Sequence, residues 1–271
     1  MSSGYTDSFK GTAAWYARYR PGYPDAMIAH VIDRFGLDGS GRLLDLGCGT
    51  GQLLIPLAPH VETAIGMDPE PEMLNEAQRV AEAAGITNAV WIEGGSLDLE
   101  RLHDQLAPLR LTTIGRAFHW MDGDATLSAL GALTVPGGGV VQCGEPCEIW
   151  SGQRDWQVAV REVIQRWLGE ERRAGSGTYA ARSDRIPWSE GDLLARSPFS
   201  QVEFQEFAYT RRLDIDDVVG YLYSMSFASP AILGDRRPAF ERDLRETLSA
   251  LAGNGPFEED HVLATYLAWK A

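Results

Sequence analysis

Basic residues are scarce in this sequence of 271 residues. There are 24 Lys and Arg against 38 Asp and Glu, which gives a formal net charge of -14. Phosphate backbones and anionic lipid surfaces are bound through clusters of Lys and Arg that displace counterions. The shortage of basic residues therefore argues against nucleic acid and anionic membranes as partners.

Long apolar runs are absent as well. No stretch resembles an 18-residue membrane span, and residues 1–10 are polar and lack the basic-then-apolar order of a secretion signal. We therefore expect a cytoplasmic protein. With 44% hydrophobic and 23% charged residues, the composition is that of a folded globular protein and excludes general disorder.

Cysteine is also rare, with only Cys48, Cys143 and Cys147. An odd, sparse set in a chain of this length does not indicate a disulfide framework. Cys143 and Cys147 have C-x3-C spacing, but no second Cys or His pair completes a zinc site. We expect free thiols and no metal.

The first half of the chain alternates short apolar runs with helical patterns, which is typical of βα units that form a mainly parallel α/β sheet. The candidate strands are residues 42–46, 63–67, 89–93, 111–118 and 139–143. The helical patterns between them are residues 51–58, 71–84, 97–106 and 124–133. Breakers such as Pro59, Gly85 and Pro108 end these helices.

The rest of the chain surrounds this core. Two helices are expected at 13–19 and 24–35, separated by the prolyl joint at 20–24. A tryptophan-rich, charged stretch at 150–198, broken by Gly-Ser-Gly at 175–177, predicts a helical insertion. Strands at 202–211 and 261–269 enclose helical patterns at 215–226 and 238–251. The domain plan is therefore a single domain over 1–271, with an N-terminal helical cap at 1–40, a βα core at 41–144, an insertion or lid at 145–198, and a C-terminal part at 199–271.

The most informative stretch is D-x-G-x-G-x-G at residues 45–51. A strand runs directly into Gly47, Gly49 and Gly51, so the backbone can turn tightly and approach a ligand with no Cβ in the way. At the end of the next strand, Asp68 is placed to accept hydrogen bonds from vicinal ribose hydroxyls. Dinucleotide folds use G-x-G-x-x-G instead, and no Walker lysine follows.

These residues resemble the first two motifs of class I S-adenosylmethionine-dependent methyltransferases, in particular the subgroup that modifies small molecules. The resemblance implies a Rossmann-like fold with a mainly parallel seven-stranded sheet, helices on both faces and a cap of helices. It also implies S-adenosylmethionine as the cofactor and S-adenosylhomocysteine as the product.

Carried over residue by residue, the resemblance assigns the cofactor site. The methionine end would be held by Asp45 and the loop residues Gly47, Cys48, Gly49 and Gly51, and the ribose by Asp68. Pro69, Met73, Ser96 and Leu97 would lie on the adenine side, although Gly94-Gly95-Ser96 lacks the family's usual acidic residue.

Two further stretches match the small-molecule subgroup. In residues 16–24, Tyr16 and Arg20 would close over the cofactor and Tyr19 would face the substrate. In residues 117–122, Ala117 would line the cofactor site, Trp120 the substrate site, and His119 is the candidate base. Glu145, just after the fifth strand, is a candidate for meeting a cationic substrate.

The predicted function is methyl transfer to N or O of a small molecule, such as an amine-bearing product of secondary metabolism, by a monomer or homodimer. Three alternatives stay open at this point: a protein or C-methyltransferase of the same fold, an NAD-dependent oxidoreductase, and a non-catalytic adenosyl-ligand binding protein.

Overall fold

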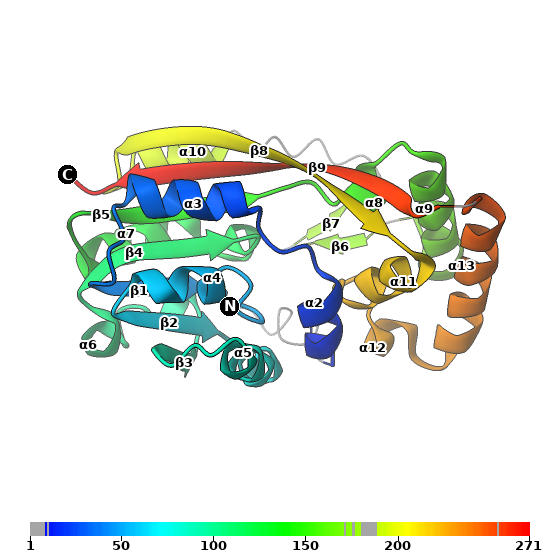
Figure 1. The fold of residues 1–271 in the computed structure, drawn as a ribbon, viewed down its shortest axis with the longest axis horizontal. Coiled ribbons are helices and arrows are strands. Elements are labelled where there is room, and N and C mark those ends of the chain that lie inside the picture. Colours follow the sequence, from blue (N-terminus) through cyan, green and yellow to red (C-terminus); the bar gives the residue numbers. More distant parts are fainter. Residues whose placement is uncertain (1–8, 10, 171, 175–176, 180–188, 254) are drawn as a thin grey trace.

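Five parallel strands and an antiparallel hairpin form one seven-stranded sheet in the computed structural model (Figure 1), which describes residues 9, 11–170, 172–174, 177–179, 189–253 and 255–271. The strand order is β3-β2-β1-β4-β5-β9-β8, and β9 pairs antiparallel with both β5 and β8. The strands are β1 (Arg42–Leu46), β2 (Thr63–Asp68), β3 (Ala89–Glu93), β4 (Leu109–Gly115), β5 (Thr134–Gly144), β8 (Gln201–Leu213) and β9 (Phe257–Trp269). This is the Rossmann-like sheet that the sequence predicts.

Apolar strands in the middle of the sheet bury both of their faces, because successive side chains point in opposite directions. Leu43 packs on one face with α3 (Asp25–Arg34) and α4 (Leu54–Leu57). Leu44 packs on the other face with α6 (His103–Leu106), α7 (Gly123–Leu133) and α10 (Ser189–Ala195). Helix α5 (Pro71–Ala83) packs against β2 and β3. The sheet is thus covered by helices on both faces.

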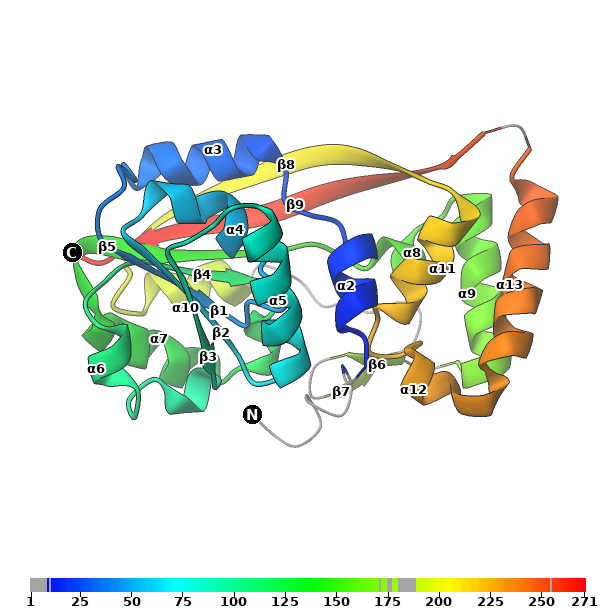
Figure 2. The same cartoon turned by 60° about the horizontal axis from the view of Figure 1, so that its bottom comes forward.

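A second group of helices forms what we call the helical lobe (Figure 2). It contains α8 (Glu148–Ser151), α9 (Asp155–Leu168), α11 (Ile215–Tyr223), α12 (Pro230–Leu233) and α13 (Arg237–Leu251). Its core includes Trp150, Tyr223 and Phe240, each at most 1% exposed. The long strands β8 and β9 run from the sheet to this lobe, where Leu213 and Phe257 join its core.

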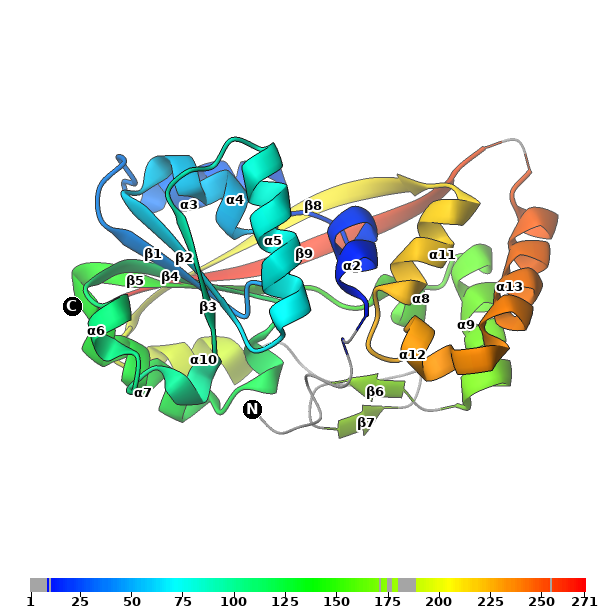
Figure 3. The same cartoon turned by 90° about the horizontal axis from the view of Figure 1, so that it is seen from below.

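Helix α2 (Ala13–Tyr19) lies between the two parts of the molecule (Figure 3). It packs against α5 beside the sheet and against α11 in the helical lobe. Trp15 stacks on Tyr19 with ring centroids 5.6 Å apart and meets the Tyr223 ring edge-on at 5.1 Å. The Tyr19 ring fills the space where a side chain at Gly220 would lie.

Several elements differ from the sequence prediction. Strand β4 ends at Gly115 and not at residue 118, because Arg116 adopts a positive φ of 54° and turns the chain. The helix expected at 97–106 is divided into a 3-10 turn, η2 (Ser96–Asp98), and α6. The helix expected at 51–58 is only α4, continued by the 3-10 turn η1 (Ala58–His60), where Pro59 interrupts the pattern.

The periodicity of the sequence also did not indicate which segments of the chain form the helical lobe. It draws α8 and α9 from the 145–198 insertion and α11 to α13 from the segment between β8 and β9. A small sheet of β6 (Arg172–Ala174) and β7 (Gly177–Tyr179) follows α9. Gly175, Ser176 and Trp188 lie outside the described residues. Within the described ranges, no helix is both long and apolar enough to cross a membrane.

Gly66 on β2 offers a test of this packing. A Cβ at this position would overlap the Trp91 ring on β3 and lie 3.1 Å from Cys48 Sγ. We expect Gly66→Ala to lower the free energy of unfolding by about 1–3 kcal/mol, as overpacked sites do. Gly144→Ala is the matched control, since nothing lies within 4 Å of its Cβ position. Urea unfolding would measure both; equal effects would contradict the packing described.

Candidate functional site

The glycine loop after β1 is held tightly in place. Gly47, Gly49 and Gly51 have φ angles of 76°, 52° and 80°, a region that residues with side chains rarely adopt. The amides of Gly47 and Cys48 both donate to the Met67 carbonyl on β2, at 2.8 and 3.1 Å. A Cβ on Gly47 would lie 2.6 Å from the Cβ of Ala117. The glycines are therefore required by both the turn and the close approach.

Asp68 joins this loop to the end of the neighbouring strand. Its side chain is fully buried, and its Oδ2 accepts a hydrogen bond from the Gly49 amide at 2.9 Å. Its Oδ1 accepts from the Glu70 amide, also at 2.9 Å. The two motifs that the sequence analysis singled out thus meet at the C-terminal edge of the sheet, where open α/β sheets bind ligands.

Asp45 lies on β1, just before the loop, and is 2% exposed. Its Oδ1 accepts from the Thr113 hydroxyl on β4 at 2.8 Å, whereas Oδ2 has no hydrogen-bond partner among the described residues. The pKa of this carboxyl is raised to about 7, mainly because burial disfavours its charged form; the Thr113 hydroxyl opposes the shift, the charge of Asp68 adds to it, and the Leu54 amide opposes it. A buried carboxylate oxygen with no donor fits a cationic ligand group.

Aromatic side chains cover the loop from the N-terminal side. The rings of Tyr16 and Trp120 both meet Phe9 edge-on, at 6.3 and 6.1 Å. Tyr16 packs over Gly49, with Cε1 3.5 Å from the position a Cβ would take there. A cavity of about 30 Å³ remains beneath these rings. Its lining residues are Phe9, Tyr16, Gly47, Gly49, Met73, Gly115, Arg116, Ala117 and Trp120.

This cavity has room for a water molecule or two, whereas pockets for small ligands have volumes of roughly 300–1,000 Å³. A nucleoside-sized ligand can therefore enter only when the aromatic side chains move. Two of these rings, Phe9 and Tyr16, precede the joint at 20–24, and the third, Trp120, follows β4.

Arg20 lies behind Tyr16, between the loop and the helical lobe. Its guanidinium stands over the Tyr16 ring at 4.9 Å and over the Tyr221 ring at 5.6 Å. Its Nη2 donates to the Ser224 carbonyl at 3.3 Å, and its buried Nε has no acceptor within the described part of the chain. An unsatisfied buried donor on a cation fits an anionic ligand group.

The structure brings most of the predicted site residues together but places several elsewhere. Asp45, Asp68, the glycine loop, Met73, Ala117, Tyr16 and Trp120 surround the small cavity or lie next to it. Pro69, Ser96 and Leu97 do not line it, and Leu97 is 72% exposed on η2. Cys48 belongs to the loop, but its side chain is buried near Gly66 on β2, where desolvation raises the pKa of the thiol well above its usual value.

The predicted catalytic and substrate residues are more dispersed. His119 is exposed on the 3-10 turn η3 (Phe118–Trp120), 5.4 Å from the Trp120 ring, and does not line the cavity. Tyr19 packs into the helical lobe. Glu145 forms a buried ion pair with Arg116 at 2.7 Å and accepts a hydrogen bond from the Tyr209 hydroxyl at 2.8 Å, so its charge is already compensated.

Sequence reasoning missed Arg116 and Phe9, both of which line the cavity. A signal for Arg116 exists: it is a cation directly after Gly115 at the end of a predicted parallel strand, where ligands bind. No comparable signal marks Phe9, which precedes the first predicted helix.

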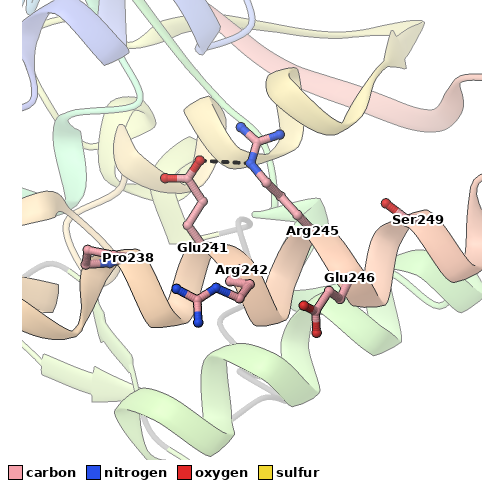
Figure 4. A pocket seen from close by; sticks show the side chains of 6 residues that line it. All are labelled: Pro238, Glu241, Arg242, Arg245, Glu246 and Ser249. Atoms are coloured by element: carbon pink, nitrogen blue, oxygen red, sulfur yellow. Dashed lines mark hydrogen bonds and ion pairs between the residues drawn. The ribbon is translucent and has the colours of Figure 1, made fainter.

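A second, wider depression lies on the outer face of α13 and is lined only by residues of that helix (Figure 4). Two of its charged groups pair with each other, Arg245 with Glu241 at 2.8 Å, and Arg245 also pairs with Asp216 at 2.7 Å. It contains none of the glycine-loop residues, and we do not assign it a ligand. In the described ranges, no cluster of three or more His, Cys, Asp or Glu could hold a metal ion.

Comparison with known proteins agrees with this geometry. Residues 43–138 match the model of a methyltransferase domain family. An uncharacterized methyltransferase-like protein of Schizosaccharomyces pombe is 24% identical over 81% of this chain and 78% of its own length. An uncharacterized methyltransferase of Mycobacterium tuberculosis is 26% identical over 91% and 89%.

Solved structures share the fold. A putative type II methyltransferase from Anaeromyxobacter dehalogenans superposes with a TM-score of 0.63 at 20% identity, covering 93% of this chain and 98% of that one. A putative methyltransferase from Bacillus halodurans gives a TM-score of 0.53 at 14% identity, over 90% and 99%. Residues 43–138 are thus a methyltransferase domain, and the whole chain has the fold of the class I S-adenosylmethionine-dependent methyltransferases. The nicotinamide-dependent alternative is therefore wrong.

The raised pKa of Asp45 leads to a prediction about stability. In the unfolded chain this carboxyl loses its proton near pH 3.9, whereas in the folded protein it keeps the proton until about pH 7. Between these values the folded state binds the extra proton, so raising the pH lowers stability, by about 4 kcal/mol in all. Asp45→Asn removes this penalty and keeps an acceptor for Thr113.

Urea unfolding between pH 4 and pH 8 would measure the effect. We expect Asp45→Asn to become progressively more stable than the wild type as the pH rises, whereas Asp104→Asn, at a fully exposed carboxylate, should follow the wild type. A constant difference between Asp45→Asn and the wild type across this range would contradict the assignment.

Proposed function

We propose that this methyltransferase transfers the methyl group to N or O of a small molecule bound between the glycine loop and the helical lobe. The observation that carries the proposal is that two charged groups near the loop each have a buried, unsatisfied atom: Oδ2 of Asp45, which directly precedes the loop, and Nε of Arg20, whose guanidinium stands over the Tyr16 ring. They match the two charges of an amino acid, an ammonium and a carboxylate. S-adenosylmethionine ends in such a group.

The other residues fit the rest of the cofactor. Gly47 and Gly49 have no Cβ that would occupy the place of the methionine end, and the Asp68 carboxylate would accept hydrogen bonds from the ribose hydroxyls. Met73, at 1% exposure, belongs to the apolar cluster over the cavity and would pack on the adenine side. Pro69, Ser96 and Leu97 lie outside the cavity lining and would complete the adenine side once the aromatic side chains over the cavity have moved.

The chemistry asks little of the protein besides positioning. The sulfonium of S-adenosylmethionine supplies an activated methyl group. The residues of this chain would align the acceptor with it and exclude water, which are the tasks that carry most of such reactions. The closed aromatic cover of Phe9, Tyr16 and Trp120 supports this proposed role.

Removal of a proton from the acceptor would fall to a side chain at the same edge. Tyr16 lines the cavity, and His119 lies beside Trp120, which also lines it. His119 is the candidate base, and it would need to turn inward when the acceptor binds. Tyr19 and Glu145 are the less direct candidates for acceptor contacts, since one packs in the helical lobe and the other is paired with Arg116.

The charge of the chain and the arrangement of its parts support the proposed acceptor class. An acidic protein suits a neutral or amine-bearing acceptor better than a polyanion such as nucleic acid. The helices at 1–40 and the insertion at 145–198 would act as a cap and a lid over the βα core at 41–144. Location in the cytoplasm, a monomeric or dimeric state and a role in secondary metabolism belong to the same proposal.

The test of the cofactor assignment is calorimetric titration with S-adenosylhomocysteine. We expect Asp68→Asn to weaken binding by about 10- to 100-fold, because it removes a charged acceptor of hydrogen bonds from two hydroxyls. Asp214→Asn is the matched control: that carboxylate also accepts a backbone N–H, at the start of α11 in the helical lobe, and Asn caps helices equally well.

If Asp68→Asn binds the ligand as tightly as the control, the ribose assignment is wrong. Transfer of a labelled methyl group to amines, phenols and alcohols, set against transfer to proteins, would then decide between a small-molecule acceptor and the protein and C-methyl alternatives. Tight binding of the cofactor with no transfer to any acceptor would favour the non-catalytic alternative.

A further inference from the structure

Arg116 has an unusual backbone conformation. Among the described residues it is the only one other than glycine with a positive φ, at 54°. Such a conformation is strained and persists only where the surroundings impose it. The Arg116 amide donates to the Cys143 carbonyl on β5 at 2.8 Å, so the residue stays attached to the sheet while its side chain turns away from the strand.

The side chain of Arg116 binds the joint at 20–24 that connects α2 with α3. Its Nη1 donates to the Pro21 carbonyl at 2.7 Å and its Nη2 to the Gly22 carbonyl at 3.2 Å. The guanidinium also stacks on the Tyr23 ring at 4.4 Å. Three consecutive residues of the joint are thus held by one guanidinium, whose side chain is only 10% exposed.

Behind Arg116 runs a buried series of charged groups. Arg116 pairs with Glu145 at 2.7 Å, and the second Glu145 oxygen lies 3.7 Å from His261 Nδ1. His261 Nε2 contacts Glu259 at 2.7 Å, and Glu259 pairs with Arg211 at 3.3 Å. Both glutamates and the histidine are at most 5% exposed in their side chains.

Both ends of this series contact the same part of the chain, the end of α2 and the joint at 20–24. Arg211, at its far end, donates to the Tyr19 carbonyl, the last residue of α2, at 2.9 Å. The two ends of the series therefore hold the C-terminal end of α2 and the joint that follows it. Its members directly follow β4 and β5 or lie on β8 and β9, so the end of α2 is attached to both the sheet and the hairpin.

We propose that Arg116 is a positioning residue of the cofactor site, acting through the joint at 20–24. By fixing the end of α2, it sets where Tyr16 lies over Gly49 and where Arg20 presents its unsatisfied Nε. The joint keeps the backbone of α2 in place when the aromatic side chains over the cavity move to admit the ligand. The inference rests on the proposed cofactor site.

Arg110 supplies a matched control on the same strand. It lies near the opposite end of β4 and likewise donates to backbone carbonyls of a loop, those of Gly36 and Ser40. Arg116→Lys and Arg110→Lys each keep the charge and lose the fork of donors that binds two carbonyls at once. Both should lower the melting temperature, but only Arg116→Lys should affect the ligand.

The measurements are calorimetric titration with S-adenosylhomocysteine and hydrogen exchange of the α2 amides. We expect Arg116→Lys to raise the dissociation constant about tenfold or more and to speed exchange in α2, while Arg110→Lys stays within about twofold of the wild type. Glu145→Gln keeps the hydrogen bonds from Arg116 to the joint, so we expect a smaller rise in the dissociation constant and a smaller increase in the exchange rate of α2. This variant replaces Arg116→Lys in the test if Arg116→Lys does not fold.

Equal weakening by Arg116→Lys and Arg110→Lys would overturn the inference, because it would indicate a general loss of stability. The inference would also be overturned if Arg116→Lys and Glu145→Gln both had the ligand affinity and the α2 exchange rates of the wild type. That result would leave the proposed function unaffected. Failure of the wild type to bind the ligand would overturn the proposed function itself, and this inference with it.

Discussion

The hydrogen bond from the Gly49 amide to the Asp68 carboxylate is the contact on which the site depends. It joins the loop after β1 to the end of β2, and it forms only because Gly49 adopts a positive φ. Gly47 brings the loop against Ala117 after β4, so three neighbouring strand ends converge. The parallel order of these strands places all three ends at one edge, which is why one loop can contact residues far apart in sequence.

Charge at this edge differs from the charge of the whole chain. The net charge of -14 says only that polyanions are poor partners. Locally, the buried Asp68 carboxylate accepts a hydrogen bond from a loop amide, and the buried Asp45 carboxyl lies on β1 directly before the loop. Arg116 and Arg211 donate to backbone carbonyls of the surrounding segments. Under the proposed function, the two charges at the methionine end of the cofactor would meet Asp45 and Arg20.

The sequence predicted the parts of the site that depend on local chemistry. Gly47, Gly49, Gly51 and Asp68 are recognisable because a tight turn after a strand and an acid after the next strand leave short patterns. The fold class and the order of strands and helices followed from apolar periodicity. The position of Arg116 after Gly115 is a signal for a residue at the site. Its contacts with Pro21, Gly22 and Glu145 were not predictable, because only the folded chain brings these residues together.

The helical lobe was missed for a related reason. Its helices come from separate insertions, and periodicity shows that Phe240 and Trp150 are buried but not that they share one core. Leu97 and His119 show the reverse case. Their positions after strand ends predict ligand contacts, and the structure leaves both side chains exposed on the 3-10 turns η2 and η3, outside the lining of the cavity; the predicted contacts are not tested by this. Direction of a side chain in a short turn is set by the tertiary fold and cannot be taken from spacing.

The central claim is that the methionine end of the cofactor lies against Asp45. Because the pKa of this carboxyl is about 7, an ammonium bound at Oδ2 would drive off the proton that the free protein holds. Titration with S-adenosylhomocysteine at pH 7, in buffers of different ionisation enthalpy, should therefore show release of about half a proton per site by the wild type relative to Asp45→Asn. Equal proton exchange by the two proteins would contradict the claim.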